Sequence, residues 1–170
     1  MNLRKSVSML PDGYAPGIAQ ISLDRLSEAG VEAIIVDLDN TLVGYHEATI
    51  SPEVAAWVEK ALARGFRVAL VSNNFSGRVA EIGKRLGVPA VHSAMKPLPG
   101  GLHRAVRLLR SDRRRTVVVG DQLLTDVIGA KLAGLRSILT EPISERGFVT
   151  TRVLRVVERA VLRLAGVRRG

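Results

Sequence analysis

Two aspartates, Asp37 and Asp39, leave an apolar run together in the segment Asp37-Leu38-Asp39-Asn40-Thr41. In an extended chain, side chains two residues apart point to the same side, so the two carboxylates can act on one substrate. One carboxylate can attack phosphorus and form an acyl phosphate, while the other protonates the leaving oxygen and later deprotonates water. This use needs a nearby cation, and Mg²⁺ suits an all-oxygen site. The alternative is a loop with two solvated aspartates.

A second group of carboxylates lies in the segment Gly120-Asp121-Gln122-Leu123-Leu124-Thr125-Asp126. Asp121 follows the apolar run Thr116 to Val119 directly, and we expect it to be a direct Mg²⁺ ligand. Asp126 falls near the start of the next predicted helix. It can bind the metal through water or cap that helix, and the sequence leaves both roles open.

Three further positions offer groups that can bind phosphate. Ser72 follows the run Val68 to Val71 and can donate its hydroxyl to a phosphate oxygen, with backbone N–H groups of Asn73 and Asn74 close by. Lys96 can place an ammonium against the nucleophile and the transferring phosphoryl group, and Arg78 can reach the substrate phosphate. The alternatives are a turn or N-cap serine, a surface lysine and a solvated helix arginine.

Short apolar runs rich in β-branched residues must position these groups, because a polar residue comes at or just after the end of three of them. The runs lack period-two alternation, which is typical of strands buried on both faces, and they alternate with segments of helical spacing. This alternation predicts a parallel sheet with helices on both sides and a ligand site at the carboxyl ends of the strands. The expected strands are 31–36, 67–71, 90–92, 116–119 and 135–139, and the expected helices are 52–63, 77–86, 99–109 and 125–133.

In this order and spacing, the motif residues Asp37-x-Asp39-x-Thr41, Ser72, Lys96 and Gly120-Asp121 with Asp126 resemble the four motifs of the haloacid dehalogenase superfamily. The resemblance implies a Rossmann-like three-layer α/β/α fold. It also implies Asp37 as nucleophile, Asp39 as acid and base, and Ser72 and Lys96 as phosphate-binding groups. Mg²⁺ would be held by Asp37, the Asp39 backbone carbonyl and Asp121. Aspartate rather than threonine at position 39 favours phosphatases or phosphomutases over transport ATPases.

More narrowly, residues 10–160 resemble the YqeG-type branch of these phosphatases, whose relatives include the mitochondrial phosphatidylglycerophosphate phosphatase. The residues that carry this resemblance are Leu10-Pro11-Asp12, the segment 37–43, Ser72-Asn73-Asn74 with Arg78-Val79, Lys96-Pro97 and the segment 120–126. The resemblance implies hydrolysis of phosphatidylglycerophosphate to phosphatidylglycerol. Phosphatases for a soluble sugar, nucleotide or protein phosphate, and an RNA- or assembly-binding module on the same fold, are the alternatives.

Loop lengths predict an open site without a large cap domain. Only 11 residues separate Asp39 from Ser51, and 23 separate Ser72 from Lys96, which leaves no room for an inserted domain. An open crevice excludes water poorly around a small metabolite but admits a bulky or membrane-bound substrate. The length of 170 residues suits one domain, which we expect over residues 1–170, with a core at about 30–145 and an N-terminal extension at 1–29.

The 170-residue chain carries a formal charge of +9 and no cysteine, which indicates anionic partners and excludes thiolate chemistry. Arg152, Arg155, Arg159 and Arg163 share one face of a predicted basic amphipathic helix at about 150–166. This helix can contact a membrane surface or pack its apolar face on the sheet. No charge-free apolar run is long enough to span a membrane, and no signal peptide is recognisable, so we expect a cytoplasmic protein, with peripheral contact to the inner face of the membrane left open.

Overall fold

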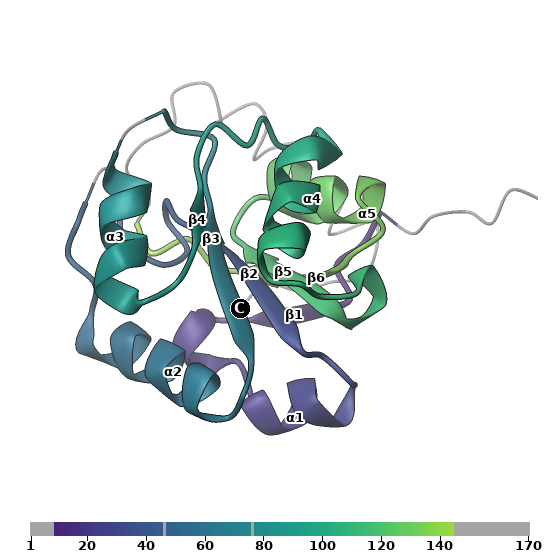
Figure 1. Cartoon of the computed structure of the whole chain (residues 1–170), viewed down its shortest axis with the longest axis horizontal. Helices are drawn as coiled ribbons and strands as arrows, with labels where there is room; N and C mark the ends of the chain where they lie inside the picture. The colour runs from purple at the N-terminus through teal and green to yellow at the C-terminus, as the bar shows by residue number, and fades with distance from the viewer. Residues whose placement is uncertain (1–8, 46, 76, 145–170) are drawn as a thin grey trace, which may run out of the picture.

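Six parallel strands form one sheet in the order β1-β6-β5-β2-β3-β4 (Figure 1). The computed structural model describes residues 9–45, 47–75 and 77–144. The central strands β2, β3 and β5 are almost wholly buried, as their unbroken apolar sequences predict for strands covered on both faces. The strands are β1 (Gly13–Ala15), β2 (Ala33–Asp37), β3 (Arg67–Val71), β4 (Ala90–Val91), β5 (Thr116–Gly120) and β6 (Arg136–Thr140).

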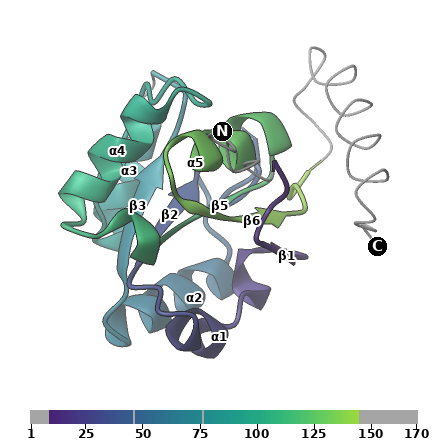
Figure 2. The ribbon, with the colours of Figure 1, turned by 90° about the vertical axis from the view of Figure 1, so that its right-hand side faces the viewer.

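Helices cover both faces of the sheet, which gives the predicted three layers (Figures 1 and 2). On one face α1 (Leu23–Glu28), α2 (Pro52–Ala63) and α3 (Arg78–Leu86) pack against one set of alternate strand residues, such as Ile34 and Val36. On the other face α4 (Pro99–Leu108) and α5 (Gly129–Leu132) pack against the intervening residues, such as Ile35. Short 3₁₀ turns are η1 (Ile18–Gln20) and η2 (Arg113–Arg115), and a π-helix, η3, spans Leu123–Ile128.

Local sequence signals account for most of these boundaries. The Ser51 hydroxyl accepts a hydrogen bond from the backbone N–H of Val54 at 3.3 Å, with Pro52 in the first turn, so α2 begins where the sequence predicts. Gly87 ends α3 with a φ of 69°, a left-handed conformation that favours glycine. The predicted helix 125–133 is corrected: it begins at Leu123, and its first six residues are π-helical rather than α-helical. Strand β4 ends at Val91 instead of His92.

The segment predicted as an N-terminal extension contributes a strand and a helix to this sheet and core. Strand β1 pairs in parallel with β6, placing Gly13 opposite Ile138. The Trp57 indole N–H donates to the Ile21 carbonyl at 2.9 Å, which ties the turn before α1 to α2. The predicted amphipathic helix at about 150–166 lies outside the described residues. In the part of the chain that is described, no helix has the length and apolar character needed to span a membrane.

Candidate active site

The predicted convergence of polar residues at one edge of the sheet is confirmed. Asp37 is the last residue of β2, and Asp121 follows the last residue of β5, which pairs directly with β2. Ligand oxygens of Asp37, Asp121 and Asp126 all lie within 4.8 Å of one another. Two carboxylates that share one cation must lie closer than about 8 Å. Asp37 and Asp121 therefore lie close enough to share one cation, as the predicted mechanism requires.

Lys96 lies between two of these carboxylates. Its Nζ is 2.5 Å from Asp37 Oδ1 and 2.5 Å from Asp126 Oδ1, and its side chain is only 2% exposed. A charge removed from water this far must be paired, and both partners are buried carboxylates. The alternative interpretation of Lys96 as a surface lysine before a proline is therefore wrong. It is part of the buried cluster.

Asp126 takes the capping position, which is one of the two roles that the sequence left open. One carboxylate oxygen accepts from the backbone N–H of Gln122 at 3.1 Å, which satisfies a free donor at the start of η3, and the other faces Lys96. The carboxylate packs directly over Gly120, where an added Cβ would lie 2.3 Å from Asp126 Cγ. Only glycine leaves room for this approach. Asp121 is held separately, since its Oδ1 accepts from the Thr41 hydroxyl at 3.3 Å.

The Asp39 carboxylate is held by two side chains from the segment after β3. Asn74 Nδ2 donates to Asp39 Oδ2 at 2.6 Å, and the Arg78 guanidinium forms an ion pair with Asp39 Oδ1. Arg78 also donates to the Glu47 carbonyl at 2.5 Å, and its side chain is only 14% exposed. Arg78 is therefore not a solvated helix arginine. The contact of Asn74 with Asp39 was not predicted, although Asn74 stands two residues after Ser72 and its polar type is a signal for such a role.

Ser72 and Asn73 organise the loop that follows β3. The Ser72 hydroxyl accepts from the Asn74 backbone N–H at 3.1 Å, which leaves its proton to be donated elsewhere. The Asn73 side chain donates to the Lys96 carbonyl at 2.9 Å and accepts from the Lys96 N–H at 2.7 Å. Asn73 thus joins the loop after β3 to the residue that carries the buried ammonium. Because the Asn73 side chain faces the backbone of Lys96, the backbone N–H of Asn73 is the group that is left as the predicted phosphate donor.

Crowded charge shifts the acid–base behaviour of the cluster. The pKa of Asp37 is raised to about 7, and burial is the main cause. The Lys96 ammonium offsets part of this rise, and the charges of Asp126 and Asp39 add to it. Burial, together with the charges of Asp37 and Asp126, raises the pKa of Asp121 to about 8. Burial by itself would lower the pKa of Lys96, but Asp126 and Asp37 hold it well above its ordinary value. Negative charge therefore exceeds what Lys96 can neutralise.

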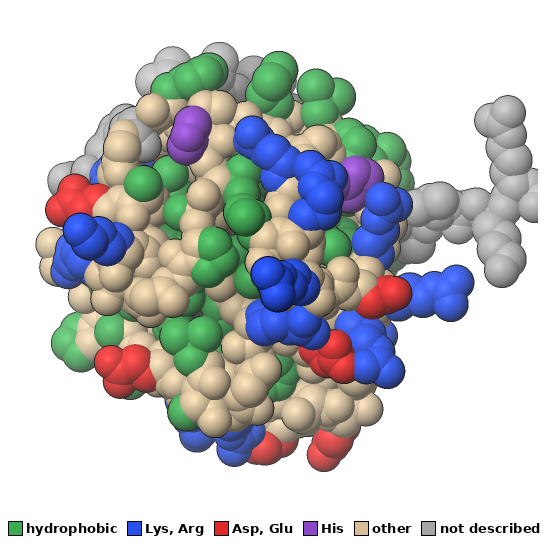
Figure 3. Space-filling view, viewed as in Figure 1, with side chains coloured by type: hydrophobic (Ala, Val, Ile, Leu, Met, Phe, Trp, Pro, Cys, Tyr) green, Lys and Arg blue, Asp and Glu red, His purple; other side chains and the backbone are tan. Residues whose placement is uncertain are grey.

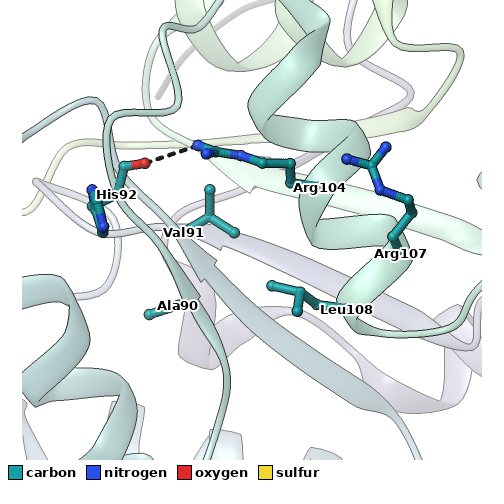
Figure 4. Close-up of a pocket in the computed structure, with 6 residues that line it drawn as sticks. All are labelled: Ala90, Val91, His92, Arg104, Arg107 and Leu108. Carbon is teal, nitrogen blue, oxygen red and sulfur yellow. Dashed lines mark hydrogen bonds between the residues drawn. The ribbon is translucent and has the colours of Figure 1, made fainter.

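The cluster fits a divalent metal ion. Asp37, Asp121 and Asp126 are buried oxygen donors with ligand atoms close enough to converge on one ion, and hard divalent cations take such ligands. A cation between them would also relieve the repulsion that adds to burial in raising the carboxylate pKa values. The groove drawn in Figure 4 is a separate feature: it is lined by β4 and α4 residues, including Arg104 and Leu108, and by none of these carboxylates.

Comparison with known proteins agrees with this geometry. Residues 10–134 match the haloacid dehalogenase-like hydrolase family. "Probable phosphatase YqeG" of Bacillus subtilis (strain 168) is 39% identical over 153 residues, which cover 90% of this chain and 89% of that protein. "Phosphatidylglycerophosphate phosphatase 1, chloroplastic/mitochondrial" of Arabidopsis thaliana is 24% identical over 87% of this chain, but the match spans only 46% of its length.

The fold is shared with solved structures. A crystal structure of a haloacid dehalogenase-like family hydrolase from Brucella suis 1330 matches with a TM-score of 0.57 and 15% identity, over 69% of this chain and 87% of that one. The parallel sheet with helices on both faces is thus the fold that the motifs predict, and the relatives support the predicted enzyme class, a phosphatase. The chain belongs to the haloacid dehalogenase-like hydrolase family.

Proposed function

We propose that this chain is a Mg²⁺-dependent phosphatase that hydrolyses phosphate monoesters through an aspartyl-phosphate on Asp37. The observation that carries the proposal is the buried cluster in which Asp37, Asp121 and Asp126 converge and Lys96 bridges two of them. Covalent catalysis by a carboxylate needs this environment, because the attacking group must approach an anionic phosphate. Mg²⁺, held by Asp37, the Asp39 backbone carbonyl and Asp121, with Asp126 directly or through water, would neutralise charge on the carboxylates and the phosphate.

In the proposed reaction an Asp37 oxygen attacks phosphorus, and the bond from phosphorus to the ester oxygen breaks. Asp39 gives its proton to that leaving oxygen. Asp39 then takes a proton from water, whose oxygen attacks the aspartyl-phosphate and releases inorganic phosphate and free Asp37. The Lys96 ammonium, 2.5 Å from Asp37 Oδ1, is well placed to stabilise charge on the transferring phosphoryl group. The Ser72 hydroxyl and the Asn73 N–H would bind a phosphate oxygen.

Two groups in this site act through others rather than on the phosphate. Arg78 and Asn74 fix the Asp39 carboxylate from opposite oxygens, which supports a positioning role for both. The sequence allows Arg78 to reach the substrate phosphate, but its ion pair with Asp39 favours orientation of the acid and base instead. The Asn73 side chain similarly positions Lys96 through two backbone hydrogen bonds.

The proposed substrate is phosphatidylglycerophosphate, whose terminal phosphate would be removed to give phosphatidylglycerol. Two observations support a lipid substrate: a relative in Arabidopsis carries that activity in its name, and the loops after β2 and β3 are too short to hold a cap domain. The site would then act at the cytoplasmic face of a membrane, with the protein in peripheral contact.

The test is phosphate release by the wild type and Asp37→Asn from an aryl phosphate, soluble sugar and nucleotide phosphates, and phosphatidylglycerophosphate in mixed micelles. We expect lipid hydrolysis that needs Mg²⁺, stops with a chelator and is lost in Asp37→Asn. Hydrolysis of the soluble esters but not the lipid would replace the proposed substrate. No release from any substrate by folded protein with Mg²⁺ would contradict the phosphatase itself.

A further inference from the structure

Large apolar side chains are exposed on the loops that surround the candidate active site. Phe75 follows β3 and is 86% exposed; Met95 and Leu98 follow β4 and are 64% and 57% exposed. Leu124 follows β5, and Ile143 follows β6. We call this set, Phe75, Met95, Leu98, Leu124 and Ile143, the apolar rim. It contains five of the nine exposed large apolar residues in the described part of the chain.

Hydrogen bonds join the rim loops into one edge around the carboxylates. The Ser93 N–H donates to the Asn74 carbonyl at 3.1 Å, which connects the loop of Phe75 with the loop of Met95. The Ile143 N–H donates to the Asn40 carbonyl at 3.0 Å, beside Asp39. Leu124 belongs to η3, whose Asp126 contacts Lys96. In Figure 3 hydrophobic side chains gather along the upper edge of the molecule, the edge that the carboxyl end of β3 reaches in Figure 1.

Exposed positive charge adjoins the rim. The Arg104 guanidinium donates to the His92 carbonyl at 3.0 Å, in the loop that runs from β4 to Met95 and Lys96. Arg107 lies one turn further along α4, and both arginines line the groove of Figure 4 with the apolar residues Val91 and Leu108. Both arginines are exposed, and within the described chain neither forms an ion pair. Their charge is therefore available to an anionic partner.

An apolar rim beside arginines that have no acidic partner among the described residues matches one kind of partner surface. A phospholipid bilayer presents an apolar boundary directly beneath a layer of phosphates, and apolar side chains with neighbouring Lys or Arg bind at that boundary. A contiguous exposed apolar patch otherwise has a cost in water and marks an interaction site. Because the rim residues lie at the same edge of the sheet as the carboxylate cluster, a membrane bound there would bring lipid phosphates toward Asp37 and Lys96.

We propose that this edge of the sheet docks on anionic phospholipid membranes, with the apolar rim entering the interface and Arg104 and Arg107 contacting lipid phosphates. The inference rests on the proposed function, because it identifies how a phosphatase site would reach a phosphate carried by a lipid. It assigns membrane binding to the catalytic edge itself, independently of the basic residues near the C-terminus.

The test is flotation of the full chain with vesicles of phosphatidylcholine alone or with phosphatidylglycerol. The double variant Phe75→Ser/Leu98→Ser should reduce partition onto the anionic vesicles about ten-fold or more, since each serine removes an apolar side chain from the interface. We expect serine to be well tolerated at both positions: Phe75 is the most exposed large apolar residue in the described part of the chain, and Leu98 is the N-cap of α4, where serine is favoured.

Leu132→Ser is the matched control, because Leu132 is 56% exposed but lies in α5, just before β6 and away from the rim. It should leave vesicle binding unchanged. Arg104→Gln/Arg107→Gln should reduce the preference for anionic over neutral vesicles. Equal binding by the wild type and Phe75→Ser/Leu98→Ser, or no binding by the wild type, would overturn the proposal. So would a rim-dependent dimer in sedimentation that persists with vesicles present, since a second copy would then cover the rim.

Hydrolysis of an aryl phosphate without vesicles separates this inference from the proposed function. Retained hydrolysis by Phe75→Ser/Leu98→Ser, with lost vesicle binding and lost lipid hydrolysis, is the expected pattern. Hydrolysis by the wild type without any vesicle binding would refute the docking surface and leave the phosphatase intact. Vesicle binding by a wild type that hydrolyses nothing would contradict the phosphatase and retain the surface.

Discussion

At the scale of single residues, Lys96 is the side chain on which the buried cluster depends most. It supplies one positive charge to Asp37 and Asp126, each at 2.5 Å, in a site that water barely reaches. Removing one partner of a buried ion pair leaves the other charge uncompensated, which costs about 3–5 kcal/mol. The residue thus links the stability of the fold to the proposed chemistry.

Lys96→Met should therefore lower the free energy of unfolding by about 3–5 kcal/mol in a chelating buffer, measured by urea denaturation. Phosphate release should fall at least a hundred-fold, because the same charge faces the proposed nucleophile. The control is Arg64→Met, which breaks the exposed ion pair with Asp24 and should cost no more than about 1 kcal/mol. If the two variants lost similar amounts of unfolding free energy, the buried ion pairs of Lys96 would stabilise the fold no more than an exposed ion pair does.

Asn74 provides a second test at this scale, since its amide donates to Asp39 Oδ2 at 2.6 Å. Asn74→Ala should lower kcat about ten- to a hundred-fold with little change in KM, because an unoriented acid and base acts only on the reaction step. Asn74→Asp has the same shape but puts a like charge against Asp39, and it should lose more activity and shift the pH profile. An unchanged kcat in Asn74→Ala would remove Asn74 from the positioning of Asp39.

At the scale of elements, β5 and η3 depend on each other through one close contact. Asp126 approaches the cluster from η3 by passing over Gly120, the last residue of β5, and a Cβ there would lie 2.3 Å from Asp126 Cγ. Two carbon atoms cannot approach this closely, so a side chain at position 120 would force either the end of β5 or the π-helical turn to shift. The glycine before Asp121 is therefore a packing requirement of the site.

Gly120→Ala should lower the free energy of unfolding by about 1–3 kcal/mol and weaken Mg²⁺ binding by displacing Asp126, as measured by denaturation and isothermal calorimetry. Gly100→Ala is the control for the same chemical change. Gly100 lies in α4 with no atom near its missing Cβ, so alanine there should be neutral or stabilising by up to about 1 kcal/mol. Unaltered Mg²⁺ binding by Gly120→Ala would place Asp126 outside the metal site.

At the scale of the whole molecule, the raised carboxylate pKa values link pH, metal and stability. In the folded chain the pKa of Asp37 is about 7 and that of Asp121 about 8, against an ordinary value of 3.8. At pH values between about 4 and 8, Asp37 and Asp121 hold more protons in the folded protein than in the unfolded chain. The free energy of unfolding of the metal-free protein should therefore fall as pH rises from about 4 to 8.

Melting curves in a chelator should show this fall, with a lower Tm at pH 8 than at pH 5.5. Mg²⁺ should raise the Tm more at pH 8, because ligands must lose their protons before they bind the ion. Asp37→Asn/Asp121→Asn provides the control, since without the two titrating groups both the slope and the Mg²⁺ effect should largely disappear. A Tm that rises with pH in the chelator would contradict the assigned pKa shifts.

The sequence by itself determined the elements whose signals are local. Helix Pro52–Ala63 and strand Arg67–Val71 have the predicted bounds, because a serine cap, an N-terminal proline and the unbroken apolar run Val68 to Val71 act over a few residues. It also determined that the carboxylates meet, since parallel strands bring their carboxyl ends to one edge. Asp37 and Asp121 converge there as the strand order predicts, and Asp126, whose role the sequence left open, lies beside them.

The tertiary structure alone decided which side chains complete the site and what surrounds it. Strand β1 has three residues and no apolar pattern, and only its register with β6 makes it a strand. The partners of Asp39 come from 35 and 39 residues further along the chain, a distance over which sequence pattern carries no orientation. The apolar rim likewise exists only after folding, because its residues come from separate loops that long-range hydrogen bonds join.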